Sequence, residues 1–194
     1  MKLIGFYDYT VILTYLSLVS AVVGMTLACS GSFTAAIVCL VFSGICDAFD
    51  GTVARTKKNR TRDEKDFGIQ IDSLCDAVSF GVFPAVICYH LGMDGPVGVV
   101  ILTLFCLCGV IRLAFFNVLE AKRQQAEAGG NKIYRGLPIT SSAIIIPIVY
   151  LLRFLVSKNT FGVILHAVLS LTGFFFVLDF SMKKPDWSKL LPQG

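Results

Sequence analysis

The chain has little charge. Asp, Glu, Lys and Arg make up only 15% of its 194 residues, whereas hydrophobic residues make up 55% and the mean hydropathy is +0.75. Soluble domains carry about 25% charged residues, so this composition excludes an ordinary soluble protein. The sequence therefore predicts an integral membrane protein.

Sequence patterns typical of zinc sites and nucleic-acid surfaces are also lacking. The only histidines are His90 and His166, near predicted span ends, where an interfacial or packing role is expected. The seven cysteines lack the paired spacing of a zinc site, and most lie in apolar runs where they would be small buried hydrophobes. No basic stripe is interleaved with aromatic residues, so we expect no nucleic-acid partner.

We find no internal repeat, low-complexity tract or separate soluble region, which predicts one membrane domain over residues 1–194. A helix crosses the bilayer core in about 20 residues. The first apolar run is too long for the core of a signal peptide, so we interpret it as a span. The prediction is an all-α fold with six transmembrane helices, at about Tyr9–Cys29, Thr34–Phe49, Ile69–Leu91, Val97–Val118, Leu137–Leu155 and Thr160–Phe180.

Basic residues indicate the orientation of these spans. They concentrate in the connectors 56–67 and 119–136 and in the C-terminal tail, whereas the opposite side has only Arg153 and Lys158. Because cytoplasmic loops carry the excess of Lys and Arg, both termini are predicted to be cytoplasmic. The two connectors are expected to be polar, solvated segments.

An ordered set of carboxylates stands at the cytoplasmic side of the second and third spans. The segment reads D-x-x-D-G-x-x-A-R from Asp47 to Arg55, and G-x-x-x-D-x-x-x-D from Gly68 to Asp76. Spacings of three and four place each pair of aspartates on one helix face. Carboxylates within a membrane are costly and usually functional.

These carboxylates need positive charge nearby. Arg112 is the only Lys or Arg predicted within a span away from its outer end, and it cannot balance four aspartates. Divalent cations could, and carboxylate ligands suit Mg²⁺, Mn²⁺ or Ca²⁺ better than zinc. Two such ions could hold a pyrophosphate and stabilise charge on the attacking and leaving oxygens.

The residues around the aspartates suit a phosphate ligand. Gly51 and Ala54 are small enough for close approach, and Arg55 offers a planar donor to a phosphate. Taken singly, Asp50-Gly51 is typical of a turn, Arg55 of a cytoplasmic loop, and Asp72 or Asp76 of a helix N-terminus. These single-residue explanations do not account for the occurrence of all eight residues together at fixed offsets.

This segment resembles the signature of the CDP-alcohol phosphotransferase family, membrane enzymes of phospholipid synthesis. The resemblance implies two divalent cations and a homodimer, with Asp76 as the general base. It implies metal ligands at Asp47, Asp50, Asp72 and Asp76. It implies CDP-binding residues at Asp50, Gly51, Ala54, Arg55, Gly68 and Asp72.

Two further stretches resemble the phosphatidylserine synthase branch of the family. They are S-F-G-V-F-P-A from Ser79 and R-L-A-F-F-N from Arg112, the latter followed by Y-R-G-L-P from Tyr134. The branch resemblance implies CDP-diacylglycerol and L-serine as substrates, giving phosphatidylserine and CMP at the membrane. The acceptor-binding candidates are Arg112, Asn117 and Arg135.

Two positions depart from this branch. Phe115 stands where a second arginine is usual, and Thr14 with Ser17 stand where Asn-x-x-Thr is common. The guanidinium of Arg112 could match the carboxylate of serine, or it could form a salt bridge with Asp179 or a signature aspartate.

Other functions fit the same residues. Within the family, the acceptor could be glycerol 3-phosphate or an inositol phosphate. Outside it, the chain could be a divalent-cation transporter, which predicts acidic residues at several depths, or a structural membrane subunit, which leaves the carboxylates unexplained.

Overall fold

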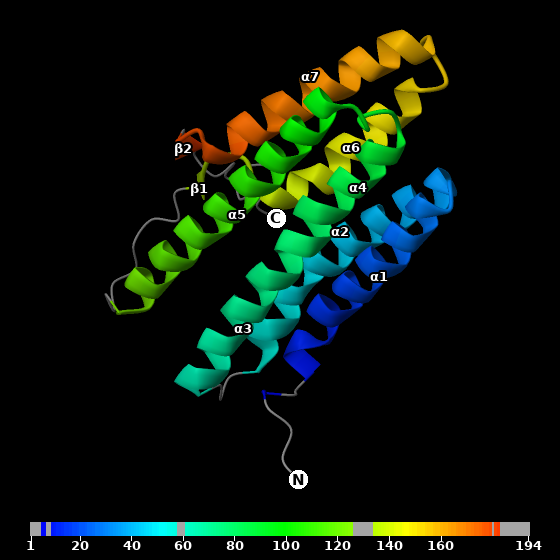
Figure 1. The fold of residues 1–194 in the computed structure, drawn as a ribbon. Helices are drawn as coiled ribbons and strands as arrows, with labels where there is room; N and C mark the ends of the chain where they lie inside the picture. The colour runs from blue at the N-terminus through cyan, green and yellow to red at the C-terminus, as the bar shows by residue number, and fades with distance from the viewer. Residues whose placement is uncertain (1–4, 7–8, 58–60, 126–133, 180, 183–194) are drawn as a thin grey trace, which may run out of the picture.

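A computed structural model describes residues 5–6, 9–57, 61–125, 134–179 and 181–182, which form a bundle of long helices (Figure 1). Two short strands, absent from the prediction, pair antiparallel beside the bundle, with Tyr134 opposite Met182. The elements in chain order are η1 (Tyr9–Val11), α1 (Ile12–Cys29), α2 (Phe33–Thr56), α3 (Arg62–Asp76), η2 (Ala77–Val82), α4 (Phe83–His90), α5 (Pro96–Gln125), β1 (Tyr134–Arg135), η3 (Ile139–Ser141), α6 (Ser142–Leu152), α7 (Lys158–Val177) and β2 (Ser181–Met182).

Among the described residues, five helical stretches are long and apolar enough to cross a membrane. They are Ile12–Cys29, Phe33–Val53, Arg62–His90, Pro96–Lys122 and Lys158–Val177. The stretch predicted as the span Leu137–Leu155 is shorter, because Pro138 is extended and the helical turns run only from Ile139 to Leu152. The all-helical class is thus confirmed, and in the described part of the chain five of the six predicted spans are long and apolar enough to be candidate membrane spans.

The outer surface of the bundle is apolar. On α2, the exposed side chains Val38, Phe42, Ile45 and Phe49 recur at helical spacing. Such a stripe would be unfavourable in water and is what a helix facing lipid requires. The described helices therefore present hydrocarbon-compatible faces outward.

In the connector predicted over residues 56–67, the described residues from Arg62 onward are helical. Thr61 forms a capping box with Glu64: the Glu64 N–H donates to Thr61 Oγ1 at 3.2 Å, and the Thr61 N–H donates to Glu64 Oε2 at 2.8 Å. This cap starts α3 at Arg62, well before the first apolar residue of the predicted span. The predicted connector 119–136 is likewise helical as far as Gln125. Asp47, Asp50 and Asp72 consequently lie inside helices rather than at their ends, and Asp76 is the last residue of α3.

A π-helical segment, η2, follows Asp76 directly. Pro84 has no N–H to donate to the carbonyl of Phe80, four residues earlier. The Ser142 hydroxyl donates to that carbonyl at 2.8 Å instead. The Phe80 carbonyl in this irregular turn therefore accepts a hydrogen bond from a residue of α6. The turn joins α3 to α4 in one continuous stretch (Figure 1).

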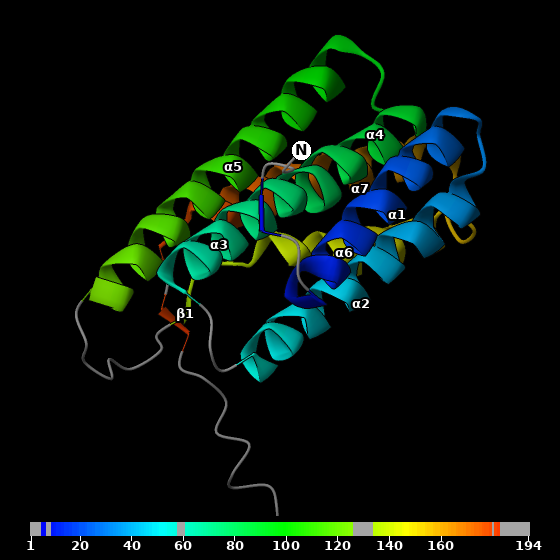
Figure 2. The same cartoon turned by 90° about the horizontal axis from the view of Figure 1, so that it is seen from below.

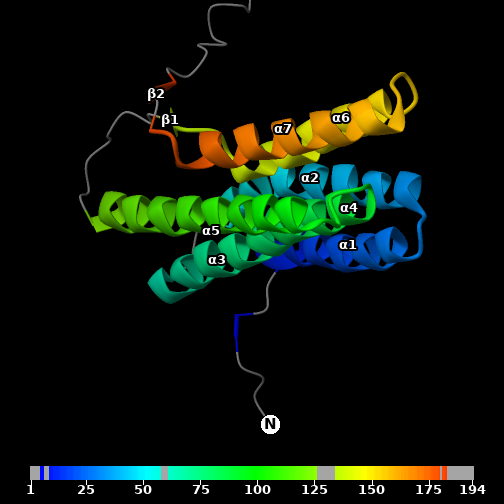
Figure 3. The same ribbon diagram turned by 45° about the horizontal axis from the view of Figure 1, so that its top comes forward.

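The ends of the helices sort into two groups (Figures 2 and 3). At one end lie the start of α1, the end of α2, the start of α3, the end of α5 and the strand pair. At the other end lie the α1–α2, α4–α5 and α6–α7 connections. Because the helices alternate in direction, both described ends of the chain leave the bundle on the same side.

Candidate functional site

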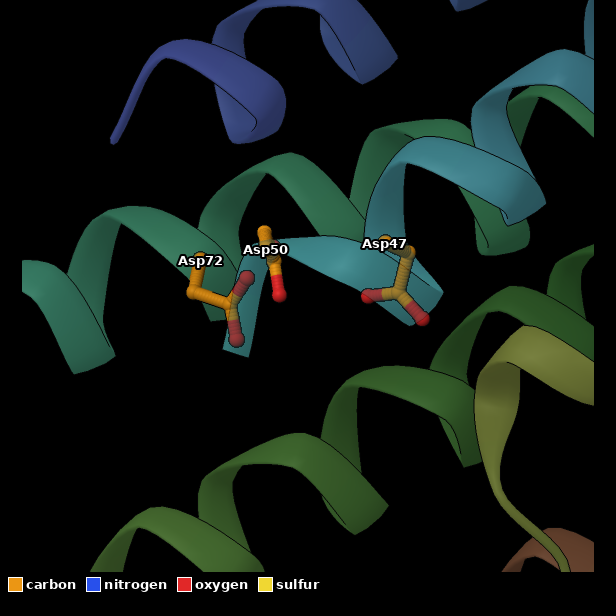
Figure 4. Close-up of side chains that lie close together, drawn as sticks. All are labelled: Asp47, Asp50 and Asp72. Carbon is orange, nitrogen blue, oxygen red and sulfur yellow. The ribbon is translucent and has the colours of Figure 1, made fainter. Parts of the chain in front are cut away.

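Aspartates from two helices meet near one end of the bundle. Asp47 and Asp50 of α2 and Asp72 of α3 each place a carboxylate oxygen within 4.8 Å of the others. Figure 4 shows the three side chains extending to the same side of α2 and α3, facing α5. Three of the four predicted metal ligands are thus brought together from distant parts of the sequence.

Asp76 adds a fourth carboxyl group to this cluster. It lies one turn after Asp72, is only 9% exposed, and is close enough to Asp47 to interact by a hydrogen bond. Asp50 and Asp72 form a corresponding contact. The four carboxyl groups therefore lie together at the α2–α3 interface, and we call them the aspartate cluster.

The aspartate cluster fits a divalent cation. The three oxygens lie within 4.8 Å of one another, and ligands on opposite sides of one ion are about 4.2 Å apart for Mg²⁺ and roughly 5 Å for Ca²⁺, so one ion could contact all three aspartates. Asp72 Oδ1 is buried and has no hydrogen-bond partner among the described residues. A buried carboxylate oxygen without a donor is unfavourable unless a cation or proton occupies the space beside it.

Hydroxyl groups missed by the sequence analysis support the cluster from α1. Thr14 Oγ1 donates to Asp50 Oδ2 at 3.2 Å. One turn later, Ser17 Oγ donates to Ser79 Oγ at 3.4 Å, and Ser43 Oγ donates to the Ser17 carbonyl at 3.0 Å. A polar pair three residues apart in an otherwise apolar span was the available signal, because such a pair faces inward in a membrane.

The predicted nucleotide-binding residues surround the cluster in part. A Cβ atom added to Gly51 would meet nothing within 4 Å, so the space beside this residue of α2 is open. Gly68 lies one turn before Asp72 on α3. Ala54 and Arg55 belong to α2, but their side chains lie outside the described part of the structure. Their contact with CDP stays a prediction.

The structure describes two of the three predicted acceptor side chains, Arg112 and Asn117, and these make different contacts. Arg112 is 8% exposed, its guanidinium carbon lies 4.4 Å from the centre of the Phe116 ring, and it lines a pocket of about 250 Å³ with Asp179. Asn117 faces α3 instead, where Ser73 Oγ donates to its Oδ1 at 2.8 Å. Arg135 lies in β1, and its side chain is outside the described part.

A glycine, Gly136, lines the same pocket as Arg112. Gly136 has φ 68°, a conformation that strongly favours glycine. A Cβ atom there would lie 3.0 Å from the Leu178 carbonyl oxygen and 3.4 Å from Arg112 Nη1. The backbone before α6 thus approaches both the arginine and the end of α7 closely.

Comparison with known proteins matches most of the chain. The sequence model of the CDP-alcohol phosphatidyltransferase family matches residues 10–177. Archaetidylserine synthase of Methanothermobacter thermautotrophicus is 35% identical over 154 residues, which cover 79% of this chain and 62% of that protein. CDP-diacylglycerol–serine O-phosphatidyltransferase of Saccharomyces cerevisiae is 39% identical over 116 residues, covering 58% of this chain and 41% of that protein.

The enzyme of that same name in Methanocaldococcus jannaschii is 32% identical over 132 residues, covering 68% of this chain and 56% of that protein. This chain thus spans about two fifths to three fifths of the length of these relatives. No solved structure matches it.

Proposed function

Because the chain belongs to the CDP-alcohol phosphatidyltransferase family, we propose that it transfers the phosphatidyl group of CDP-diacylglycerol to the hydroxyl group of L-serine. The observation that carries the proposal is the meeting of Asp47, Asp50 and Asp72 within 4.8 Å. The names of the relatives support the acceptor, since two of them are CDP-diacylglycerol–serine O-phosphatidyltransferases. The products would be phosphatidylserine and CMP.

In this reaction, the serine oxygen forms a bond to the phosphorus that carries diacylglycerol, and the bond from that phosphorus to CMP breaks. Asp76 accepts the hydroxyl proton as the general base. Asp47, Asp50 and Asp72 would share with it the binding of two divalent cations, Mg²⁺ or Mn²⁺, with Ca²⁺ also fitting the ligands. When bound, these ions would neutralise phosphate charge and stabilise the oxygens at which charge develops.

The nucleotide would lie beside α2. The open space at Gly51 admits a ligand close to the helix backbone. Asp50, Ala54, Arg55, Gly68 and Asp72 would surround the CDP moiety, with Arg55 as the donor to a phosphate oxygen. The lipid tails would remain in the bilayer.

The Arg112 pocket is our candidate for the amino-acid end of the acceptor. Arg112 would bind the serine carboxylate, and Asp179 in the same pocket would bind its ammonium group. A phosphorylated acceptor, such as glycerol 3-phosphate or an inositol phosphate, would be repelled by Asp179. The pairing of one cation with one anion therefore favours a zwitterionic acceptor.

Helix directions and basic residues support a cytoplasmic active site. The aspartate cluster lies toward the end of the bundle that carries the start of α1 and the end of α2 (Figure 1). Lys57 and Lys65 lie at that same end, in agreement with the rule that basic residues stay in the cytoplasm. We further propose a homodimer, whose partner would cover part of the apolar surface.

The proposal is tested with purified protein, CDP-diacylglycerol and a panel of alcohols, by following CMP release. We expect release only with L-serine and with Mg²⁺ or Mn²⁺, and none after chelation with EDTA. CDP-archaeol as a second lipid donor would show whether isoprenoid tails are accepted.

Release of CMP with glycerol 3-phosphate but not serine would reassign the acceptor. No release with any alcohol would reopen the transporter alternative, against which the family membership now argues.

A further inference from the structure

A second cavity, of about 670 Å³, lies at the end of the bundle opposite the aspartate cluster. It is formed where helices begin and end: Phe33 is the first residue of α2, His90 the last of α4, and Lys158 the first of α7. Arg153, just after α6, and Asp94, between α4 and α5, complete its polar lining. The volume is in the range of small-molecule binding sites.

The charges in this cavity are available to a ligand. Among the described residues, no salt bridge joins Asp94 to Arg153 or Lys158. The guanidinium carbon of Arg153 lies 5.4 Å from the ring centre of Phe33 and 6.0 Å from that of Tyr150. Contact with aromatic faces holds the guanidinium against the cavity wall while its N–H edges stay free to donate.

The surroundings place this cavity at the boundary between hydrocarbon and headgroups. Arg153 is followed by Phe154 and Leu155, which are 72% and 77% exposed, and Leu151 is 60% exposed. Such side chains are stable outside the bundle only in contact with lipid. An arginine beside them extends its guanidinium to the level of lipid phosphates, as basic residues near span ends do.

We propose that this cavity binds the headgroup of a zwitterionic aminophospholipid from the leaflet opposite the aspartate cluster. Arg153 and Lys158 bind the phosphate, and Asp94 binds the ammonium group. The first turn of α7, with its outward N–H groups, adds favourable potential for the phosphate beside Lys158. The combination of two cations and one anion matches a phosphoethanolamine group better than a purely anionic headgroup.

The test measures lipid binding to the full chain in detergent by native mass spectrometry. The ligands are phosphatidylethanolamine, phosphatidylglycerol and glycerophosphoethanolamine, the headgroup without tails. We expect phosphatidylethanolamine to bind most tightly and the free headgroup most weakly, because the tails add apolar contact with Phe154 and Leu155.

Three variants separate the contributions of the cavity residues. Combined Arg153→Gln and Lys158→Gln should raise the Kd for both lipids about tenfold or more, since two charge-assisted hydrogen bonds are lost. Asp94→Asn should abolish the preference for phosphatidylethanolamine. Lys122→Gln, which removes a cation near the opposite end of the bundle, should change neither Kd, and thermal unfolding of each variant checks its folding.

An unchanged Kd in the folded double variant would overturn the site. Equal binding of the two lipids to the unsubstituted protein would overturn the aminophospholipid assignment. Free headgroup binding as tightly as the lipid would show that the cavity takes a soluble phosphodiester. None of these results depends on CMP release, so they stand apart from the proposed transferase activity.

Discussion

At the scale of single residues, the aspartate cluster is defined by charges that destabilise one another. Four carboxyl groups share the α2–α3 interface, and Asp72 Oδ1 has no partner among the described residues. Without cations such an arrangement costs free energy, because like charges repel most strongly where water is excluded. Function, rather than stability, explains why these residues occur together.

Replacement of Asp76 by Asn tests its role as the base. Asn cannot accept the serine proton, so turnover should fall by about 10²-fold or more, while CDP-diacylglycerol binding stays nearly unchanged. Loss of one negative charge should also leave the metal-free protein at least as stable. CMP release, lipid-donor binding and thermal unfolding in EDTA measure the three effects.

Asp66→Asn is the matched control, because Asp66 is an exposed residue of the same helix. Its Oδ2 lies 3.9 Å from Nε of Arg62, which is also exposed, so the substitution removes a carboxylate from the helix surface only. It should retain full activity. Substantial turnover by Asp76→Asn would remove Asp76 as the base.

Arg112→Lys tests the acceptor pocket. Lysine keeps the charge but loses both the bidentate fork and the stacking on Phe116, so the KM for serine should rise about tenfold while the KM for CDP-diacylglycerol changes little. Arg62→Lys, on the exposed face of α3, is the control. Equal rises in both KM values would indicate a structural role for Arg112 instead.

At the scale of elements, the continuous stretch α3–η2–α4 depends on an exchange of hydrogen bonds. Pro84 leaves the Phe80 carbonyl without its helical donor, and Ser142 of α6 supplies a replacement at 2.8 Å. This contact ties α6 to the turn that follows Asp76. The position of α6 is thereby coupled to that of the proposed base.

A double-mutant cycle tests that coupling. Ser142→Ala should destabilise the protein by about 0.5–2 kcal/mol, because a buried carbonyl loses its donor. In a Pro84→Ala background the residue-84 N–H can bond to Phe80, so the same substitution should cost less. Thermal unfolding in detergent measures all four proteins, and equal costs in both backgrounds would contradict the exchange.

At the scale of the whole molecule, alternating helix directions put both described chain ends on the side of the aspartate cluster (Figure 3). We expect that side to be cytoplasmic. A fluorescent protein fused to the C-terminus should therefore fluoresce in cells. An epitope inserted at Gly95, in the α4–α5 turn, should be reached by antibody only from outside, and antibody access to a C-terminal epitope in intact cells would reverse the orientation.

The sequence alone predicted much of this arrangement. Long apolar runs predicted most of the spans, because a bilayer demands about 20 apolar residues whatever the neighbouring helices do. Local capping was harder to predict: Thr61 and Glu64 start α3 inside a segment that composition alone described as a connector. Pro138 and the short turn after it made the Ile139–Leu152 helix shorter than its apolar run suggested.

The sequence by itself determined the helical class, the carboxylate motif and the family resemblance, since these follow from composition and from offsets along the chain. Only the tertiary structure decided that Thr14 supports Asp50, that Asn117 faces Ser73 rather than Arg112, and that Arg153 and Asp94 share a cavity. Those facts depend on which helix faces pack together. That packing brings together residues 36 to 59 apart along the chain, either in a hydrogen bond or around one cavity, and no local periodicity records it.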